Sequence, residues 1–152
     1  MLQGFSDKDT IDQIVLLDTI KDTGRVDLLP DLMELYATPH PDQAVEEIVY
    51  YTLVTLLRQA PEALLRGLRH PSERVRLVAI QCGGEEQLPA VFPILVEQLR
   101  GTPSPEYLGA IILALSHFHD PALPALIAPF VNHEDDTVAA YARQAMELFR
   151  EP

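Results

Sequence analysis

Several residue types that would define a class of protein are scarce or missing. The chain has no tryptophan, one cysteine, and 11 lysines and arginines against 23 aspartates and glutamates, so its formal net charge is −12 at pH 7. A single cysteine, Cys82, cannot form an internal disulfide, which excludes a disulfide-stapled scaffold and is compatible with a cytoplasmic protein. The shortage of bases disfavours nucleic acid as a partner, because phosphate binding depends on clustered Lys and Arg. An acidic chain is better suited to a basic protein partner.

Long hydrophobic runs and targeting segments are also missing. The longest apolar stretch, residues 121–131, is much shorter than the roughly 20 residues that a membrane-spanning helix needs. Four aspartates interrupt the N-terminal segment, so no secretion signal is expected there. Without a low-complexity tract to divide it, a chain of 152 residues with 47% hydrophobic content predicts one globular domain, residues 1–152.

Charge is distributed unevenly along the chain. Residues 1–47 hold 11 acids and 3 bases, residues 48–81 hold 2 and 5, and residues 82–152 hold 10 and 3. The simpler interpretation is that these charges lie on solvated helix faces, and the alternative is that the middle segment is a basic band used for binding. The arginines of this central basic band are Arg58, Arg66, Arg69, Arg74 and Arg76.

Proline is plentiful, and four of the 13 prolines recur at a nearly constant interval. Pro30, Pro61, Pro93 and Pro124 are separated by 31, 32 and 31 residues, and an apolar run follows each of them. Proline fits the first turn of a helix, where its missing N–H has no partner to lose. Each of these prolines therefore predicts the start of a helix.

A second series with the same period lies between the prolines. His40, His70, Thr102 and His133 are spaced 30, 32 and 31 residues apart and predict breaks between helices. After each break, apolar or small residues recur at helical spacing and form columns on one face of the next helix. The first column is Val45, Val75, Tyr107 and Val138, and the last column, with small or modest residues suited to close helix crossings, is Thr52, Cys82, Ala114 and Ala145.

Two offset series with one period describe a unit of two antiparallel helices. Such units are stable only when neighbouring units cover one another's apolar stripes. The sequence therefore predicts an all-α protein, a right-handed α-α superhelix of about four helix pairs plus a C-terminal helix. First helices are expected near residues 8–21, 42–58, 72–82, 104–117 and 135–149, and second helices near 26–37, 61–69, 87–100 and 121–131. The repeats are expected at 1–39 (an N-terminal cap), 40–69, 70–101, 102–132 and 133–152 (a C-terminal capping helix).

The central repeats resemble a known family. The segment Pro71-Ser-Glu-Arg-Val-Arg-Leu-Val-Ala-Ile80 is similar to the first helix of the HEAT-like repeat of phycobilisome-lyase type, which carries a Val-Arg-x-x-Ala core. Residues 110–126, ending in Asp120-Pro-Ala-Leu-Pro-Ala-Leu126, resemble the following half of that repeat and its neighbour. The resemblance implies a HEAT-like solenoid whose second helices line a concave face, and it does not import lyase chemistry. Asp18 and Thr19 depart from the apolar columns, as expected of a cap whose outer face meets water.

One cluster of residues resembles metal ligands. It consists of His117, His119 and Asp120, with the acidic segment 133–136 farther along the chain. These residues lie in predicted turns, and His133 shares its repeat position with two other histidines. We therefore expect these histidines to have a turn role and the chain to bind no metal and no cofactor. A metal-dependent enzyme is the disfavoured alternative.

Signals for a nucleotide site or a nucleophile are weak. Gly83-Gly84 lacks the spacing of a phosphate-binding loop, and we expect it to end the helix that precedes it. No serine lies in a Gly-x-Ser-x-Gly context, and Cys82 belongs to a packing column. The sequence therefore predicts no catalytic residue.

The expected function is recognition rather than catalysis. The family resemblance implies that a partner protein contacts polar residues of the second helices, which would make the chain a non-enzymatic interaction module such as a scaffold or adaptor. The alternative is an immunity or antitoxin-type protein that neutralises a basic toxin by stoichiometric binding, because such proteins are often small, cytoplasmic and acidic. The predicted contact residues are Asp31, Glu34, Arg66, Arg69, Glu97 and Arg100.

The last predicted second helix, residues 121–131, has no polar side chain and must be covered. The final helix can cover one side of it. The simpler interpretation is that the final helix caps the array, and the alternative is that this C-terminal edge pairs with a second copy of the chain or with a partner.

Overall fold

The computed structural model describes residues 2–101 and 104–150. Within these residues the backbone forms nine α-helices, three short 3₁₀ helices and no β-strand, so the predicted all-α class is confirmed. The α-helices are α1 (Thr10–Asp22), α2 (Leu29–Ala37), α3 (Gln43–Leu57), α4 (Pro61–Gly67), α5 (Glu73–Glu85), α6 (Val91–Arg100), α7 (Pro105–Leu115), α8 (Leu123–Ile127) and α9 (Asp136–Arg150). The 3₁₀ helices are η1 (Phe5–Asp7), η2 (Val26–Leu28) and η3 (Ala128–Phe130).

Helix starts follow the proline series. Pro61 is the first residue of α4, Pro30 and Pro124 are the second residues of α2 and α8, and Pro93 is the third residue of α6. All four lie in a first turn, where a backbone N–H would have no intrahelical acceptor, so proline loses no hydrogen bond there. The first helices use polar caps instead: for example, the Asp9 carboxylate accepts the backbone N–H of Asp12 at 2.8 Å before α1.

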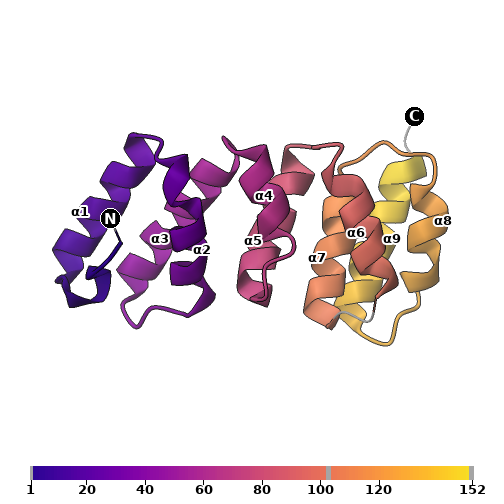
Figure 1. Ribbon diagram of the computed structural model, residues 1–152. Coiled ribbons are helices and arrows are strands. Elements are labelled where there is room, and N and C mark those ends of the chain that lie inside the picture. Colours follow the sequence, from indigo (N-terminus) through magenta and orange to yellow (C-terminus); the bar gives the residue numbers. More distant parts are fainter. Residues whose placement is uncertain (1, 102–103, 151–152) are drawn as a thin grey trace. The chain divides into compact units, whose positions relative to one another are not determined.

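The helices form two compact units, residues 1–79 and residues 80–152, and the division falls within α5. In the first unit α1 packs against α3, and α2 packs against α3 and α4. In the second unit α7 packs against α6 and α9, and α8 packs against α9 (Figure 1). In each unit, helices pair with their neighbours in the chain and first helices pack on first helices, which is the arrangement that the repeat period predicts.

The predicted columns form the core of the units. Every residue of the first column and of the last column is at most 5% exposed. Where a polar group falls in the last column it is satisfied, because the Thr52 hydroxyl donates to the Ile48 carbonyl at 2.6 Å within its own helix. Cys82 is fully buried, which confirms its place in a packing column.

Gly83-Gly84 does not end its helix, contrary to expectation. The α5 helix continues through both glycines to Glu85. A Cβ atom added at Gly84 would lie only 2.9 Å from the Cα and Cβ atoms of Ala114 on α7. The glycine is therefore needed for the close approach of two helices rather than for a turn.

We expect Gly84→Ala to lower the free energy of unfolding by about 1–2 kcal/mol, because the clash with the α7 backbone exceeds the gain of about 1 kcal/mol in helix propensity. Urea denaturation of the full chain measures this. The matched control is Gly101→Ala, where the new Cβ would meet only the Gln98 carbonyl at 3.4 Å, so its stability should stay near that of the wild type. A Gly84→Ala variant as stable as the wild type would contradict the proposed packing.

All four predicted second helices differ from their expected bounds. The segment expected over 26–37 is η2 followed by α2, and α4 ends at Gly67 instead of residue 69. The segment expected as one helix over 121–131 is α8 followed by η3, because Pro129 has no N–H to continue the α-helical bonding. The helix expected from residue 87 begins at Val91, after Gln87 takes a positive φ of 51° in the turn. Thr102, the third member of the predicted break series, lies outside the described residues.

The three histidines of the break series make one repeated contact. The Nδ1 atoms of His40, His70 and His133 accept the backbone N–H two residues later, at 2.9, 3.0 and 3.0 Å. An imidazole nitrogen here replaces the side-chain oxygen of an Asx turn, so each histidine fixes the chain reversal before a first helix. The predicted turn role is confirmed.

We expect His133→Ala to destabilise the chain by about 1 kcal/mol, because the backbone N–H of Asp135 loses its acceptor. His133→Asn should keep most of that stability, since its carbonyl oxygen can accept the same N–H. Thermal unfolding of the two variants and the wild type compares them. Equal losses for alanine and asparagine would show that the ring, and not its acceptor atom, stabilises the turn.

Candidate functional site

The predicted contact residues of α2 lie on its solvent face. Leu29, Leu32 and Met33 are buried, whereas Asp31 and Glu34 are exposed. This follows from the 3.6-residue period, which places buried positions three and four residues apart and leaves the opposite face to polar residues. Asp31 lies in the first turn, where a negative charge also complements the helix dipole.

Like α2, the α4 helix buries its apolar residues and exposes its charged ones, but its exposed charges are positive. Ala63, Leu64 and Gly67 are buried, whereas Arg66, in the last turn, and Arg69, just after the helix, are exposed. Exposed side chains of this kind do not help to form the core. The charge of α4 and of the residues just after it therefore lies on the exposed face.

Close packing brings the acidic and basic helices together within the first unit. A Cβ at Gly67 of α4 would lie 3.5 Å from the Met33 Cε atom of α2, so the helices touch where a side chain is absent. The His70 Nδ1 accepts the Ser72 N–H, which leaves Nε2 to carry a proton and to donate to the Glu34 carboxylate at 2.7 Å. One acid of the candidate surface is thus held beside the turn that follows α4.

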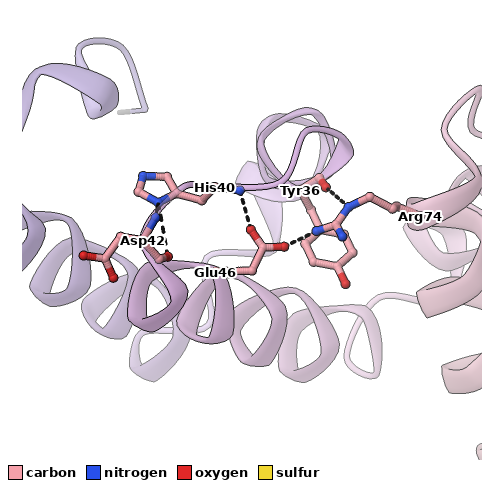
Figure 2. Close-up of polar contacts among 5 residues, drawn as sticks. All are labelled: Tyr36, His40, Asp42, Glu46 and Arg74. Carbon is pink, nitrogen blue, oxygen red and sulfur yellow. Dashed lines mark hydrogen bonds and ion pairs between the residues drawn. The ribbon is translucent and has the colours of Figure 1, made fainter.

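A second polar cluster in the first unit holds the turn between α2 and α3 (Figure 2). The Arg74 Nε donates to the Tyr36 carbonyl at 2.9 Å, and the guanidinium lies 4.2 Å from the centroid of the Tyr36 ring. Another nitrogen of the guanidinium is hydrogen-bonded to the Glu46 carboxylate. That carboxylate also accepts the His40 backbone N–H at 2.6 Å. Arg74 therefore joins the start of α5 to α2 and α3.

Local electrostatics follow from these contacts. Burial raises the pKa of Tyr36, and the positive charge of Arg74 opposes that shift. At the start of α3, the backbone N–H of Val45 holds the pKa of Asp42 below its ordinary value, and the Thr10 hydroxyl contributes less. Asp42 therefore stabilises the start of α3 at neutral pH, and this contribution is lost as the pH falls through its lowered pKa.

The central basic band separates into structural and surface arginines. Arg74 belongs to the turn cluster, and Arg76 donates to the carbonyls of His70 and Pro71 at 2.8 and 2.9 Å. Arg58, Arg66 and Arg69 are exposed. The band is therefore not one continuous surface, because Arg74 and Arg76 bond to backbone carbonyls and Arg74 also to Glu46.

In the second unit, the predicted residues Glu97 and Arg100 are exposed on α6. The opposite face of this helix buries Val91, Leu95 and Leu99. The strong separation of apolar and polar positions makes α6 an amphipathic surface helix. Its two charged residues thus have the same kind of position as those of α2 and α4.

Three polar residues line one pocket of the second unit. A pocket of about 560 Å³ in the second unit is lined by Ser116, His119 and Asp120, together with apolar side chains such as Phe118 and Phe149. The Ser116 hydroxyl donates to the Leu113 carbonyl at 2.5 Å, and the Asp120 carboxylate accepts the Ala122 N–H at 2.8 Å. Both polar groups therefore bond to nearby backbone.

Neither a metal cluster nor a membrane span is found in the described part of the chain. Across residues 2–101 and 104–150, no three His, Cys, Asp or Glu side chains gather as metal ligands would. Over the same residues, no helix has the length and apolar character needed to cross a bilayer.

Repeated helix pairs, buried columns on the first helices and exposed charges on the second helices α2, α4 and α6 define an α-helical repeat protein. The sequence pattern of the family described as HEAT repeats matches residues 61–147, more than half of the chain, so the chain belongs to the HEAT repeat family. Proteins of this family commonly mediate protein–protein interactions and are generally non-enzymatic scaffolds. Comparisons with curated proteins and with solved structures find no match. The phycobilisome-lyase subtype stays a prediction.

The sequence did not indicate several surface features. Ile11 and Val15 on α1 are 72% and 57% exposed, although the outer face of a cap was expected to be polar. Arg143 and Arg150 line a groove beside α9. Helical spacing could have placed Ile11 and Val15 on one face, but only the structure shows that this face is the outer one.

Proposed function

We propose that this chain is a non-enzymatic protein-binding module whose recognition surface is the polar face of the second helices, the concave face expected of a right-handed HEAT superhelix. One observation carries the proposal: every predicted contact residue is exposed, while the apolar residues of the same helices are buried. These contact residues are Asp31, Glu34, Arg66 and Arg69 in the first unit and Glu97 and Arg100 in the second. A cytoplasmic location is part of this proposal, and a sequence with a single, buried cysteine is compatible with it.

The charge pattern defines the kind of partner. Acidic α2 and basic α4 lie side by side, so a partner with the opposite pattern gains from both helices, and a partner with a uniform charge is repelled by one of them. Such complementarity sets the association rate and specificity more than the affinity. The net charge of −12 additionally steers basic proteins toward the chain.

The proposal predicts that a charge change on a second helix weakens partner binding more than the same change on a first helix. The partner is first identified by affinity capture from native lysate and mass spectrometry, and its affinity for variants is then measured by calorimetry. Asp31→Lys with Glu34→Lys should weaken binding about tenfold or more. The matched control is Glu47→Lys with Glu106→Lys, which makes the same charge change at exposed positions of the first helices α3 and α7.

A second pair of substitutions separates a charge pattern from general attraction. Arg66→Glu with Arg69→Glu should also weaken binding, although it makes the chain more acidic, and it should leave stability nearly unchanged because both side chains are exposed. Tighter binding by this variant, or equal losses for the second-helix and first-helix pairs of lysine substitutions, would show that only net charge attracts the partner. Either result would refute the proposed surface.

An immunity-type function is the second candidate, and the charge of the second unit favours it. Residues 80–152 hold 10 acids against 3 bases, which suits tight binding to one basic toxin. A stoichiometric complex with a single basic protein, whose toxic activity stops on binding, would support this candidate. Several weaker clients would support the adaptor instead.

A further inference from the structure

The pocket of about 560 Å³ in the second unit has apolar walls and a carboxylate at its edge. Residues of the turn between α7 and α8, of the start of α8 and of the last turn of α9 line it. Leu148 is 45% exposed there, and the Phe118 ring makes an edge-on contact with Phe92, with ring centroids 5.4 Å apart. The volume is within the range of about 300–1,000 Å³ that is usual for ligand sites. The apolar lining residues are Phe118, Pro121, Pro124, Leu148 and Phe149.

Asp120 gives this pocket its negative charge. One oxygen of its carboxylate accepts the Ala122 N–H at 2.8 Å, and within the described part of the chain no ion pair joins the carboxylate to a base. The other polar lining residues are Ser116 and His119. Since no lysine or arginine of the described residues lines the pocket, the charge of Asp120 is not neutralised there.

Two helix ends add to the negative potential of the pocket. Ser116 is the C-cap of α7, and Leu148 and Phe149 lie in the last turn of α9. The last carbonyl groups of a helix have no intrahelical partner and carry a partial negative charge, which favours a cation. Arg150 shares the last turn of α9 but lines the groove beside η3 instead. The pocket is therefore suited to a cationic group on an apolar stem.

We propose that this pocket binds an arginine side chain that a partner protein presents. The guanidinium meets the Asp120 carboxylate, and the aliphatic stem lies against Pro121, Pro124 and Leu148. Arginine fits better than lysine because its planar guanidinium can form two parallel hydrogen bonds with a carboxylate and is attracted to aromatic rings. Arginine is also one of the residue types that contribute most to binding at protein interfaces.

The charge of the second unit supports a basic partner. Residues 80–152 hold 10 acids against 3 bases, so their field attracts a basic surface toward the pocket. The inference rests on the proposed function in one respect only, that the arginine belongs to a protein. None of the six residues of the proposed recognition surface lines the pocket. A test with peptides needs no captured partner, so the pocket and the second-helix surface can fail separately.

Amide chemical shifts of the isotopically labelled full chain, recorded by NMR, test the proposal with a short arginine peptide. The probe is acetyl-Ala-Arg-Ala-amide, and two matched peptides replace the arginine by citrulline, which has nearly the same shape without the charge, or by norleucine, which is apolar. At pH 7.5, where imidazole is ordinarily neutral, the arginine peptide should bind with millimolar affinity and the matched peptides about three- to fivefold more weakly. The shifted amides should be those of Phe118, His119, Asp120, Leu148 and Phe149.

Three results overturn the proposal. Equal binding of the arginine and norleucine peptides would show a general apolar groove, and equal binding of the arginine and citrulline peptides would show that the charge is not recognised. Shifts located away from the pocket, or no shifts at peptide concentrations well above millimolar, would show that the pocket is not the site.

Asp120→Asn separates the charge of the pocket from its fold. The amide oxygen can still accept the Ala122 N–H, so the turn is kept, whereas affinity for the arginine peptide should fall about three- to fivefold. The matched control is Asp135→Asn, which makes the same change before α9, where Asp135 accepts the Thr137 N–H at 3.0 Å. Circular dichroism verifies that both variants are folded. Unaltered affinity for Asp120→Asn, or an equal loss for the control, contradicts the proposal.

Discussion

The close approach of neighbouring first helices is the constraint on which the rest of the structure depends. Helices can come this near only where side chains are small, as at Gly84, which leaves no room for a Cβ beside Ala114, and at Gly109, where an added Cβ would lie 3.0 Å from the Tyr141 ring. Because first helices bury their apolar columns against one another, the shorter second helices pack with one face only. The other face of α2, α4 and α6 carries charge, and this division between folding and surface residues makes recognition the function that the fold supports best.

The repeat period explains why much of this architecture could be predicted. Residues such as Val45 and Val138 recur because each repeat buries the same face of its first helix against neighbouring helices. Their burial therefore follows from spacing alone. The local chemistry of Gly83-Gly84 misled the prediction of the helix end, because a glycine that permits close helix contact has the same sequence signal as one that ends a helix. The contact that decides between the two interpretations, Ala114, lies far along the chain and is not visible in the local pattern.

The charged residues show a similar limit. The sequence counts Arg74 and Arg76 with Arg66 as one basic band, but Arg74 meets Tyr36 and Glu46, whose positions depend on the packing of three helices. The exposed positions of the six candidate contact residues could be predicted, since they follow from the helical period. The exposed apolar face of α1 could not, because the sequence does not show which side of an end helix meets water. Arg74 and Arg76 thus hydrogen-bond to backbone carbonyls near the turns, whereas the side chains of Arg66 and Arg69 are exposed.

The central claim is that the second helices recognise a partner while the first helices form the core. Amide chemical shifts of the isotopically labelled chain, recorded by NMR as the captured partner is added, test this claim residue by residue. The account predicts that the largest changes occur on the exposed faces of α2, α4 and α6, with smaller changes on the exposed faces of α3 and α7. Changes concentrated on α3 and α7, or confined to the turns between helices, would contradict it.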